Sequence, residues 1–247
     1  MFKRVVTILL SLCMCFSTAF ASGATAGSAE QLSSNSSAAS RTDWLTGEYD
    51  TTFVEVNSVE IEIPVIRNSP SPVTTSGGVT TVTETIFVPD MTEESLERNR
   101  QIVSEIKAYG APATRGYGDF YVGGYIWYHS TLNYTTTTVQ SKTYFDLLSF
   151  KLEREIYTNA PFNSFHNATA RAVQVGYPHP DYAPYSPYEQ EKDYGTIAYN
   201  QLHSIPGSWV PVSPAEQHIG VHYTVYIDFL SSFGQSDYPL SYTHQAV

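Results

Sequence analysis

Two histidines, His218 and His222, are four positions apart, a spacing that lets two imidazoles share one metal ion when they lie on a helix. Apolar and polar residues alternate around them, so the segment is predicted to be a strand. On a strand the two side chains lie about 13 Å apart on one face, too far to share an ion. A neighbouring strand that carries His129 or His203 would have to complete such a site. The sequence predicts neither a metal site nor a cofactor.

Paired carboxylates raise a second kind of chemistry, because glycosidases use two Asp or Glu residues that meet in space rather than in sequence. The acidic residues on predicted strands are Asp119, Asp146, Glu153, Glu155 and Asp228. Glu153 and Glu155 share a strand face with Lys151, which favours a solvated charged stripe over a catalytic pair. The chain has no serine-hydrolase elbow, zinc-protease motif, phosphate loop or dinucleotide fingerprint. We therefore predict no catalytic residue.

Residues 177–188 read Tyr-Pro-His-Pro-Asp-Tyr-Ala-Pro-Tyr-Ser-Pro-Tyr, the most unusual local stretch of the chain. Prolines hold such a segment extended without ladder hydrogen bonds, so its rings can be displayed to solvent. Exposed tyrosines suit sugar faces and protein surfaces. We predict Tyr182, Tyr185 and Tyr188 as ligand-binding residues. The alternative is that these rings fold back over the edge of the sheet and close the core.

Four acidic residues lie in and after this stretch: Asp181, Glu189, Glu191 and Asp193. Their oxygens suit calcium, but they do not form the twelve-residue loop of an EF-hand. Solvated acidic side chains are the favoured interpretation.

The first 21 residues predict export. Lys3 and Arg4 precede an apolar segment and an Ala19-Phe20-Ala21 cleavage site, a pattern typical of secretory signals, here of bacterial appearance. Both cysteines lie within this segment, so the mature chain is predicted to contain no disulfide. Residues 22–48 are rich in Ser, Ala, Thr and Gly and are predicted to be a disordered linker. The expected location is extracellular.

The net charge of the chain restricts the classes of partner that the sequence predicts. The chain has a net charge of −11, and no cluster of Lys and Arg interrupts it, so nucleic acid is excluded as a partner. After the signal there is no apolar run near the ~20 residues that span a bilayer, so no membrane span is predicted. The sequence predicts neither the oligomeric state nor a particular partner protein.

Residues 49–116 are predicted to form an extension with short strands and one helix. Apolar residues alternate over 51–66 with a break at residues 57–58, and again over 79–88. A helix is expected at about 91–108, where Asp90 and Glu93 form a capping box. Its apolar stripe is Leu96, Ile102, Val103 and Ile106.

Residues 117–247 are predicted to form the main domain. Strand patterns recur at 120–127, 132–139, 148–153, 169–175, 195–202, 208–212 and 219–229, separated by turn residues. Tyrosine and threonine, both abundant here, fit half-buried pleated surfaces. The expected fold is all-β, an antiparallel β-sandwich of about six to eight strands.

Three functions are compatible with these features. The favoured one is an exported, non-catalytic module that binds a glycan, a cell-wall polymer or a protein surface. The first alternative is a secreted hydrolase that acts on polysaccharide through carboxylates. The second is a secreted toxin or bacteriocin, because the polar-apolar alternation over residues 131–138 is similar to the strands of pore-forming proteins.

Overall fold

The computed structural model describes residues 48–56, 58–67, 72–89, 91–109, 125–157, 164–165, 168–182, 186–228 and 238–246. All of them belong to one compact unit, Ser36–Val247. The predicted signal peptide, nearly all of the predicted linker, the boundary at residues 116–117 and Tyr185 lie outside the described residues.

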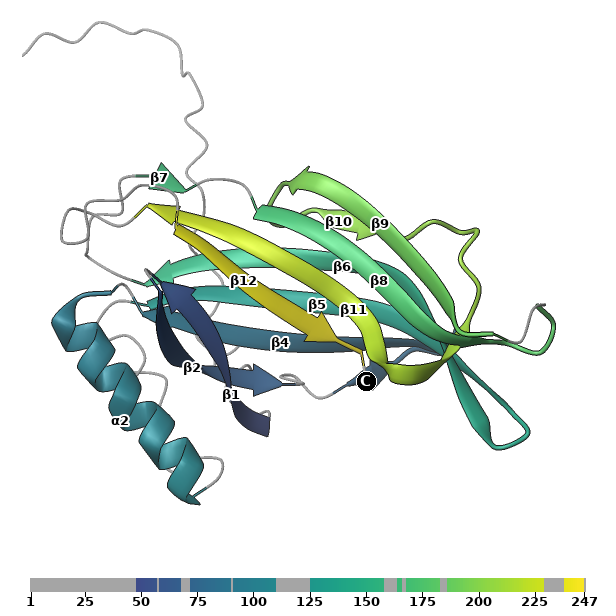
Figure 1. Ribbon diagram of the computed structural model, residues 1–247, viewed down its shortest axis with the longest axis horizontal. Coiled ribbons are helices and arrows are strands. Elements are labelled where there is room, and N and C mark those ends of the chain that lie inside the picture. Colours follow the sequence, from purple (N-terminus) through teal and green to yellow (C-terminus); the bar gives the residue numbers. More distant parts are fainter. Residues whose placement is uncertain are drawn as a thin grey trace, which may run out of the picture. The chain divides into compact units, whose positions relative to one another are not determined.

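Twelve strands form one continuous sheet, and every strand pairing in it is antiparallel (Figure 1). The elements, in chain order, are β1 (Glu48–Val56), β2 (Val59–Arg67), β3 (Val73–Thr74), β4 (Val79–Pro89), α2 (Glu93–Tyr109), β5 (Tyr125–Val139), β6 (Lys142–Tyr157), β7 (Ser164–Phe165), β8 (Ala168–Pro178), β9 (Tyr188–Ile197), β10 (Leu202–Ser204), β11 (Val212–Asp228) and β12 (Tyr238–Gln245). The predicted antiparallel β-fold with one helix is confirmed. The predicted number of six to eight strands is exceeded, because β1–β4 of the predicted extension join β5–β12 in one sheet.

The main path through the sheet is β1-β2-β4-β5-β6-β11-β8-β9. The predicted extension therefore supplies β1, β2, β3 and β4 to the same sheet as the predicted main domain. β1 and β2 form a hairpin whose turn includes Ser58 at a φ of 59°, which matches the predicted break in alternation. Each strand of this part pairs with the next along the path, and β4 pairs with β5 over eleven residue pairs.

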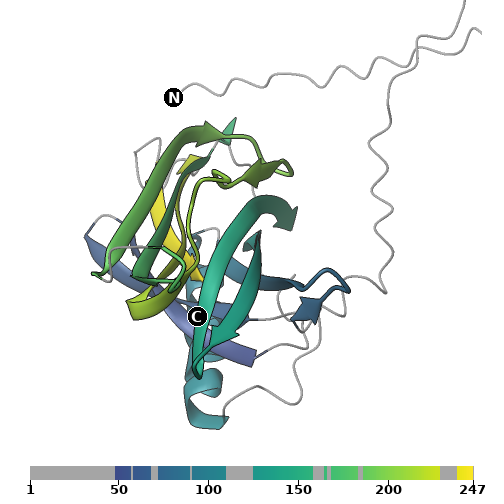
Figure 2. The same cartoon turned by 90° about the vertical axis from the view of Figure 1, so that its right-hand side faces the viewer.

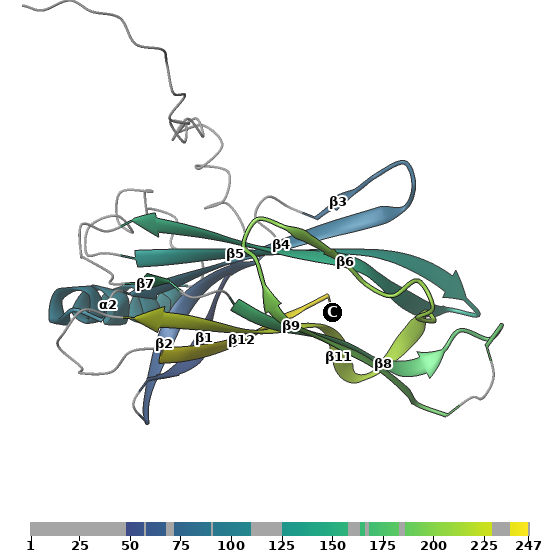
Figure 3. The same ribbon diagram turned by 90° about the horizontal axis from the view of Figure 1, so that it is seen from above.

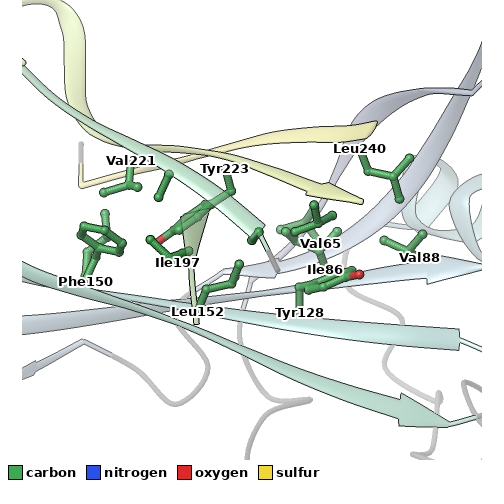
Figure 4. Close-up of a cluster of buried hydrophobic side chains, with 14 of the residues drawn as sticks. Val65, Ile86, Val88, Tyr128, Phe150, Leu152, Ile197, Val221, Tyr223 and Leu240 are labelled. Carbon is green, nitrogen blue, oxygen red and sulfur yellow. The ribbon is translucent and has the colours of Figure 1, made fainter. Parts of the chain in front are cut away.

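The sheet folds over so that β4, β5 and β6 lie in one layer and β8, β11 and β12 lie in the other (Figure 3). Alternate residues of both layers point inward and meet in one apolar core. Figure 4 shows part of this core, with Phe150 and Leu152 of β6 on one side and Val221 and Tyr223 of β11 on the other. Burial of these side chains is the main stabilising term for the two layers.

Helix α2 packs against β1, β2 and β4. Ile102, Val103 and Ile106 are buried as the helical stripe predicts. Thr92 caps the helix, because its Oγ1 accepts from the backbone N–H of Ser95 at 3.2 Å; the predicted cap, Asp90, lies outside the described residues. The described part of the chain contains no helix that is both long and apolar enough to cross a membrane.

Several strands differ in extent from their sequence patterns. The predicted strand at 132–139 is part of the longer β5, which joins β6 through Gln140 and Ser141, both at positive φ (50° and 66°) as a tight hairpin turn requires. The pattern at 219–229 is part of the longer β11, which has a bulge between Pro214 and Ile219, whereas of the pattern at 208–212 only Val212 lies in a strand. The pattern at 195–202 covers the end of β9 and the start of β10.

Candidate functional site

The β8–β9 hairpin carries the sequence-predicted tyrosines. Tyr182 and Tyr188 are 44% and 46% exposed, and Tyr177, which the sequence did not single out, is 45% exposed. Tyr185, the third predicted ligand-binding residue, lies outside the described residues. Among the described residues seven large hydrophobic side chains are exposed, and three of them are these tyrosines. The hairpin therefore concentrates aromatic surface at its connecting end.

Backbone hydrogen bonds hold the start of this connection in place. The N–H of His179 donates to the Pro211 carbonyl at 2.9 Å, and the N–H of Tyr182 donates to the His179 carbonyl at 2.9 Å. The His179 ring packs edge-on against Tyr144, with ring centroids 5.0 Å apart, and lies 6.3 Å from the Tyr182 ring. Tyr144 itself is buried. Tyr182 is thus displayed on an anchored turn, which lowers the entropic cost of binding through it.

β8, β9 and β11 are neighbouring strands of the sheet (Figure 2). Residues of these three strands line a hollow of about 450 Å³ on their outer face. It is lined by Thr169, Ala170 and Arg171 of β8, Asp193 and Gly195 of β9, and His222 and Thr224 of β11. We call this set the outer hollow. Residues that alternate with these, such as Ala172 and Tyr223, belong to the core. The period of two along each strand therefore turns the polar members outward.

Polar contacts fix the side chains of the outer hollow. Arg171 forms an ion pair with Glu191 on the neighbouring strand, and Asp193 Oδ1 accepts from the backbone N–H of Gly195 at 2.7 Å. His222 Nδ1 lies 2.7 Å from Thr243 Oγ1 of β12. The register between β8 and β9 shifts next to Arg171, and Gly195 has a φ of 58°, a conformation that favours glycine. The bulge places a guanidinium and a carboxylate side by side.

A second polar set, buried except for its arginine, has the residue types of a catalytic site. Ser130 Oγ lies 2.7 Å from His244 Nδ1, and His244 Nε2 lies 4.0 Å from Glu84 Oε2. The Ser130 hydroxyl donates to Tyr223 Oη at 3.0 Å, and Arg67 Nε lies 3.4 Å from Glu84 Oε1. We call these five residues the interior chain. Ser130 and His244 are 0% and 1% exposed, so no substrate reaches them.

Burial dominates the electrostatics of the interior chain. It raises the pKa of Glu84 to about 7, more than the nearby Arg67 guanidinium lowers it. It also lowers the pKa of His244 to about 3, with a smaller contribution from Arg67. His244 is therefore neutral at physiological pH. Since Ser130 donates to Tyr223, it accepts from the Nδ1–H of His244, and the network serves to satisfy buried polar atoms.

The cavity within the core is small. It has a volume of about 20 Å³ and is bordered by apolar side chains of both layers together with Tyr128 and Tyr223. That volume accommodates about one water molecule. This cavity is too small for an organic ligand.

The other sequence candidates are spread over the molecule. Glu153 pairs with Lys151 at 2.9 Å, in line with a charged stripe, and burial raises the pKa of Asp146. His129 Nδ1 lies 2.8 Å from Thr85 Oγ1, and His203 stacks on Phe150. Asp119 and the side chains of His218 and Asp228 lie outside the described residues. Among the described residues no three His, Cys, Asp or Glu side chains gather as a metal site would require, and Asp181 lies beside His179, away from Asp193.

The outer hollow was missed from sequence, although two of its residues were noted separately. The sequence indicates only that Arg171 lies within the strand pattern at 169–175 and that Asp193 belongs to an acidic group. The signal that could have found them is the strand pairing that places Arg171 opposite Asp193. The chain matches no protein family, and neither a curated protein nor a solved structure is detectably similar to it.

Proposed function

We propose that this chain is an exported, non-catalytic protein that binds an extracellular polymer, a glycan or a cell-wall polysaccharide, through the connecting end of the β8–β9 hairpin. The observation that carries the proposal is the group of exposed tyrosines, Tyr177, Tyr182 and Tyr188, at one end of this hairpin. Aromatic rings with a polar tip stack on sugar faces at low entropic cost. Export rests on the sequence of residues 1–21.

The scaffold supports this use. We further propose that the two facing layers act as a β-sandwich, because apolar residues of β4–β6 pack against those of β8, β11 and β12. Such a scaffold holds the hairpin rigidly while its connecting end meets the polymer. The described residues offer no added support for the hydrolase or the toxin.

The test is sedimentation of residues 22–247 with insoluble peptidoglycan, chitin, cellulose and xylan. Retention by one polymer is expected, with binding about tenfold or more weaker after replacement of Tyr177, Tyr182 and Tyr188 together by Ala. Phe53→Ala, which removes an aromatic ring of 54% exposure on β1, serves as the matched control. Absence of retention by every polymer, or equal binding by the triple variant, would contradict the proposal.

A further inference from the structure

The outer hollow combines a cationic, an anionic and several neutral polar groups within about 450 Å³. This volume lies within the range of small-ligand sites. Arg171 supplies planar N–H donors, Asp193 supplies acceptor oxygens, and Thr169 and Thr224 have hydroxyls that both donate and accept. A ligand that meets all of these groups must itself carry donors and acceptors around its rim.

The charges of the surroundings restrict the ligand. Arg171 faces Glu191 and Asp193, and Glu189 precedes them on the same strand. An anion would meet more negative than positive charge here, and the net charge of −11 repels it at longer range. A metal ion would lack ligands, since the described residues contain no group of three metal-binding side chains. A neutral polyhydroxylated molecule remains as the class that fits.

The position of the hollow relates it to the exposed tyrosines. Arg171 and Tyr177 lie on the same strand, six positions apart, and therefore on the same face about 20 Å from each other. An extended polymer that lies along β8 would contact both. Because an aromatic surface provides stacking and little discrimination, hydrogen-bonding groups at the other end of the strand have to supply selectivity.

We infer that the outer hollow is the subsite that recognises a neutral sugar unit of the bound polymer, with Arg171 and Asp193 hydrogen-bonding its hydroxyls. This inference rests on the proposed function, of which it names the selective element. Asp193 is held in place by the Gly195 N–H and Arg171 by Glu191, so both are oriented before the sugar arrives.

The backbone amide of Gly195 provides a direct reporter, because its N–H bonds to Asp193 inside the hollow. Residues 22–247 labelled with ¹⁵N are titrated with cellohexaose, with the hexamers of N-acetylglucosamine, xylose and mannose, and with inorganic phosphate. One neutral hexamer is expected to shift the Gly195 resonance in a saturable way. The amide of Gly207, which lies in a turn between β10 and β11, is the internal reference and stays unchanged.

Asp193→Asn and Arg171→Gln are each expected to weaken that hexamer, and the polymer it comes from, by about tenfold. The matched control is Glu189→Gln, which changes a residue of β9 that lies outside the hollow. This variant is expected to bind as the wild type does. A thermal unfolding curve for each variant separates lost binding from lost folding.

The remaining outcomes are distinguishable. Polymer retention that depends on the tyrosines but not on Arg171 or Asp193 would overturn the subsite and leave the proposed function standing. A Gly195 shift with phosphate alone would overturn the neutral sugar. A failure of every polymer and every hexamer would overturn both proposals.

Discussion

The interior chain and the outer hollow contain the same kinds of side chain in two different environments. Each has one arginine, one acidic residue, one histidine and hydroxyls, taken from neighbouring strands. In the interior chain the acid and the histidine are 6% and 1% exposed, whereas Asp193 and His222 are exposed. The difference teaches that access, not residue identity, decides which set can meet a ligand.

The interior chain also illustrates how burial changes the role of a residue. Glu84 takes up a proton near neutral pH and His244 stays neutral, so a set that resembles a nucleophilic triad becomes part of the core. The outer hollow keeps its groups hydrated until a ligand replaces the water. The comparison therefore predicts large stability effects in one region and binding effects in the other.

The largest expected effect comes from Gly220→Ala, which tests how tightly the interior chain is enclosed. A Cβ at this position would lie 2.1 Å from the backbone oxygen of His244, and a backbone atom cannot move aside cheaply. We expect the free energy of unfolding to fall by about 4 kcal/mol in urea denaturation. Gly207→Ala, where no atom lies within 4 Å, should change stability by no more than about 0.5 kcal/mol. Equal losses would refute the close packing.

Replacing the two histidines compares the regions directly. His244→Ala removes the hydrogen bond to Ser130 and leaves a cavity, and we expect it to lower the free energy of unfolding by about 3 kcal/mol. His222→Ala changes an exposed side chain on the adjacent strand and should lower it by about 0.5 kcal/mol or less. Chemical denaturation of both variants measures the difference. A loss for His244→Ala as small as that for His222→Ala would show that the interior network contributes little.

The raised pKa of Glu84 makes the stability of the folded protein depend on pH. Its pKa is about 7 in the folded chain and 4.5 in the unfolded chain, so the folded state binds the proton more tightly between these values. Stability contributed by this proton is complete below pH 4.5 and is lost as pH rises through 7. Relative to Glu84→Gln, the wild type should lose about 2 kcal/mol between pH 5 and pH 8.

The measurement is the difference between the two unfolding free energies at each pH. His129 and His244, whose folded pKa values are about 3, destabilise both proteins as pH falls below 6.5, so their contribution cancels in the difference. A difference that does not change with pH would mean that Glu84 is hydrated in solution.

Local patterns in the sequence predict the elements that have one apolar face and one polar face. The helix follows from the stripe of Ile102, Val103 and Ile106, and the β1–β2 hairpin follows from alternating residues on either side of Ser58. Residues 188–194 of β9 were not predicted, because charged exposed residues there resemble a loop, although Gln190 between them is buried. β12 was missed because polar residues occupy inward positions, His244 among them.

The candidate site could be predicted only in part for a related reason. The tyrosines are close together in sequence, so composition alone drew attention to them. The outer hollow depends on the register that pairs Arg171 with Asp193 and on the bulge beside it. A one-residue slip would turn one of these side chains inward, and nothing in either strand by itself indicates the register.

The smallest expected effect, that of Tyr223→Phe, tests whether the interior chain acts as a network. This change removes the hydroxyl that accepts from Ser130 at 3.0 Å and keeps the buried ring that packs against Phe150. We expect a loss of about 1 kcal/mol, because Ser130 keeps its bond to His244 while its own proton loses an acceptor. A double variant, Tyr223→Phe with His244→Ala, should then lose less than the sum of the two single losses, since both single changes disrupt the same hydroxyl. Additive losses would mean that Ser130 does not couple the two layers. Its hydrogen bonds to Tyr223 and to His244 would then contribute independently to stability.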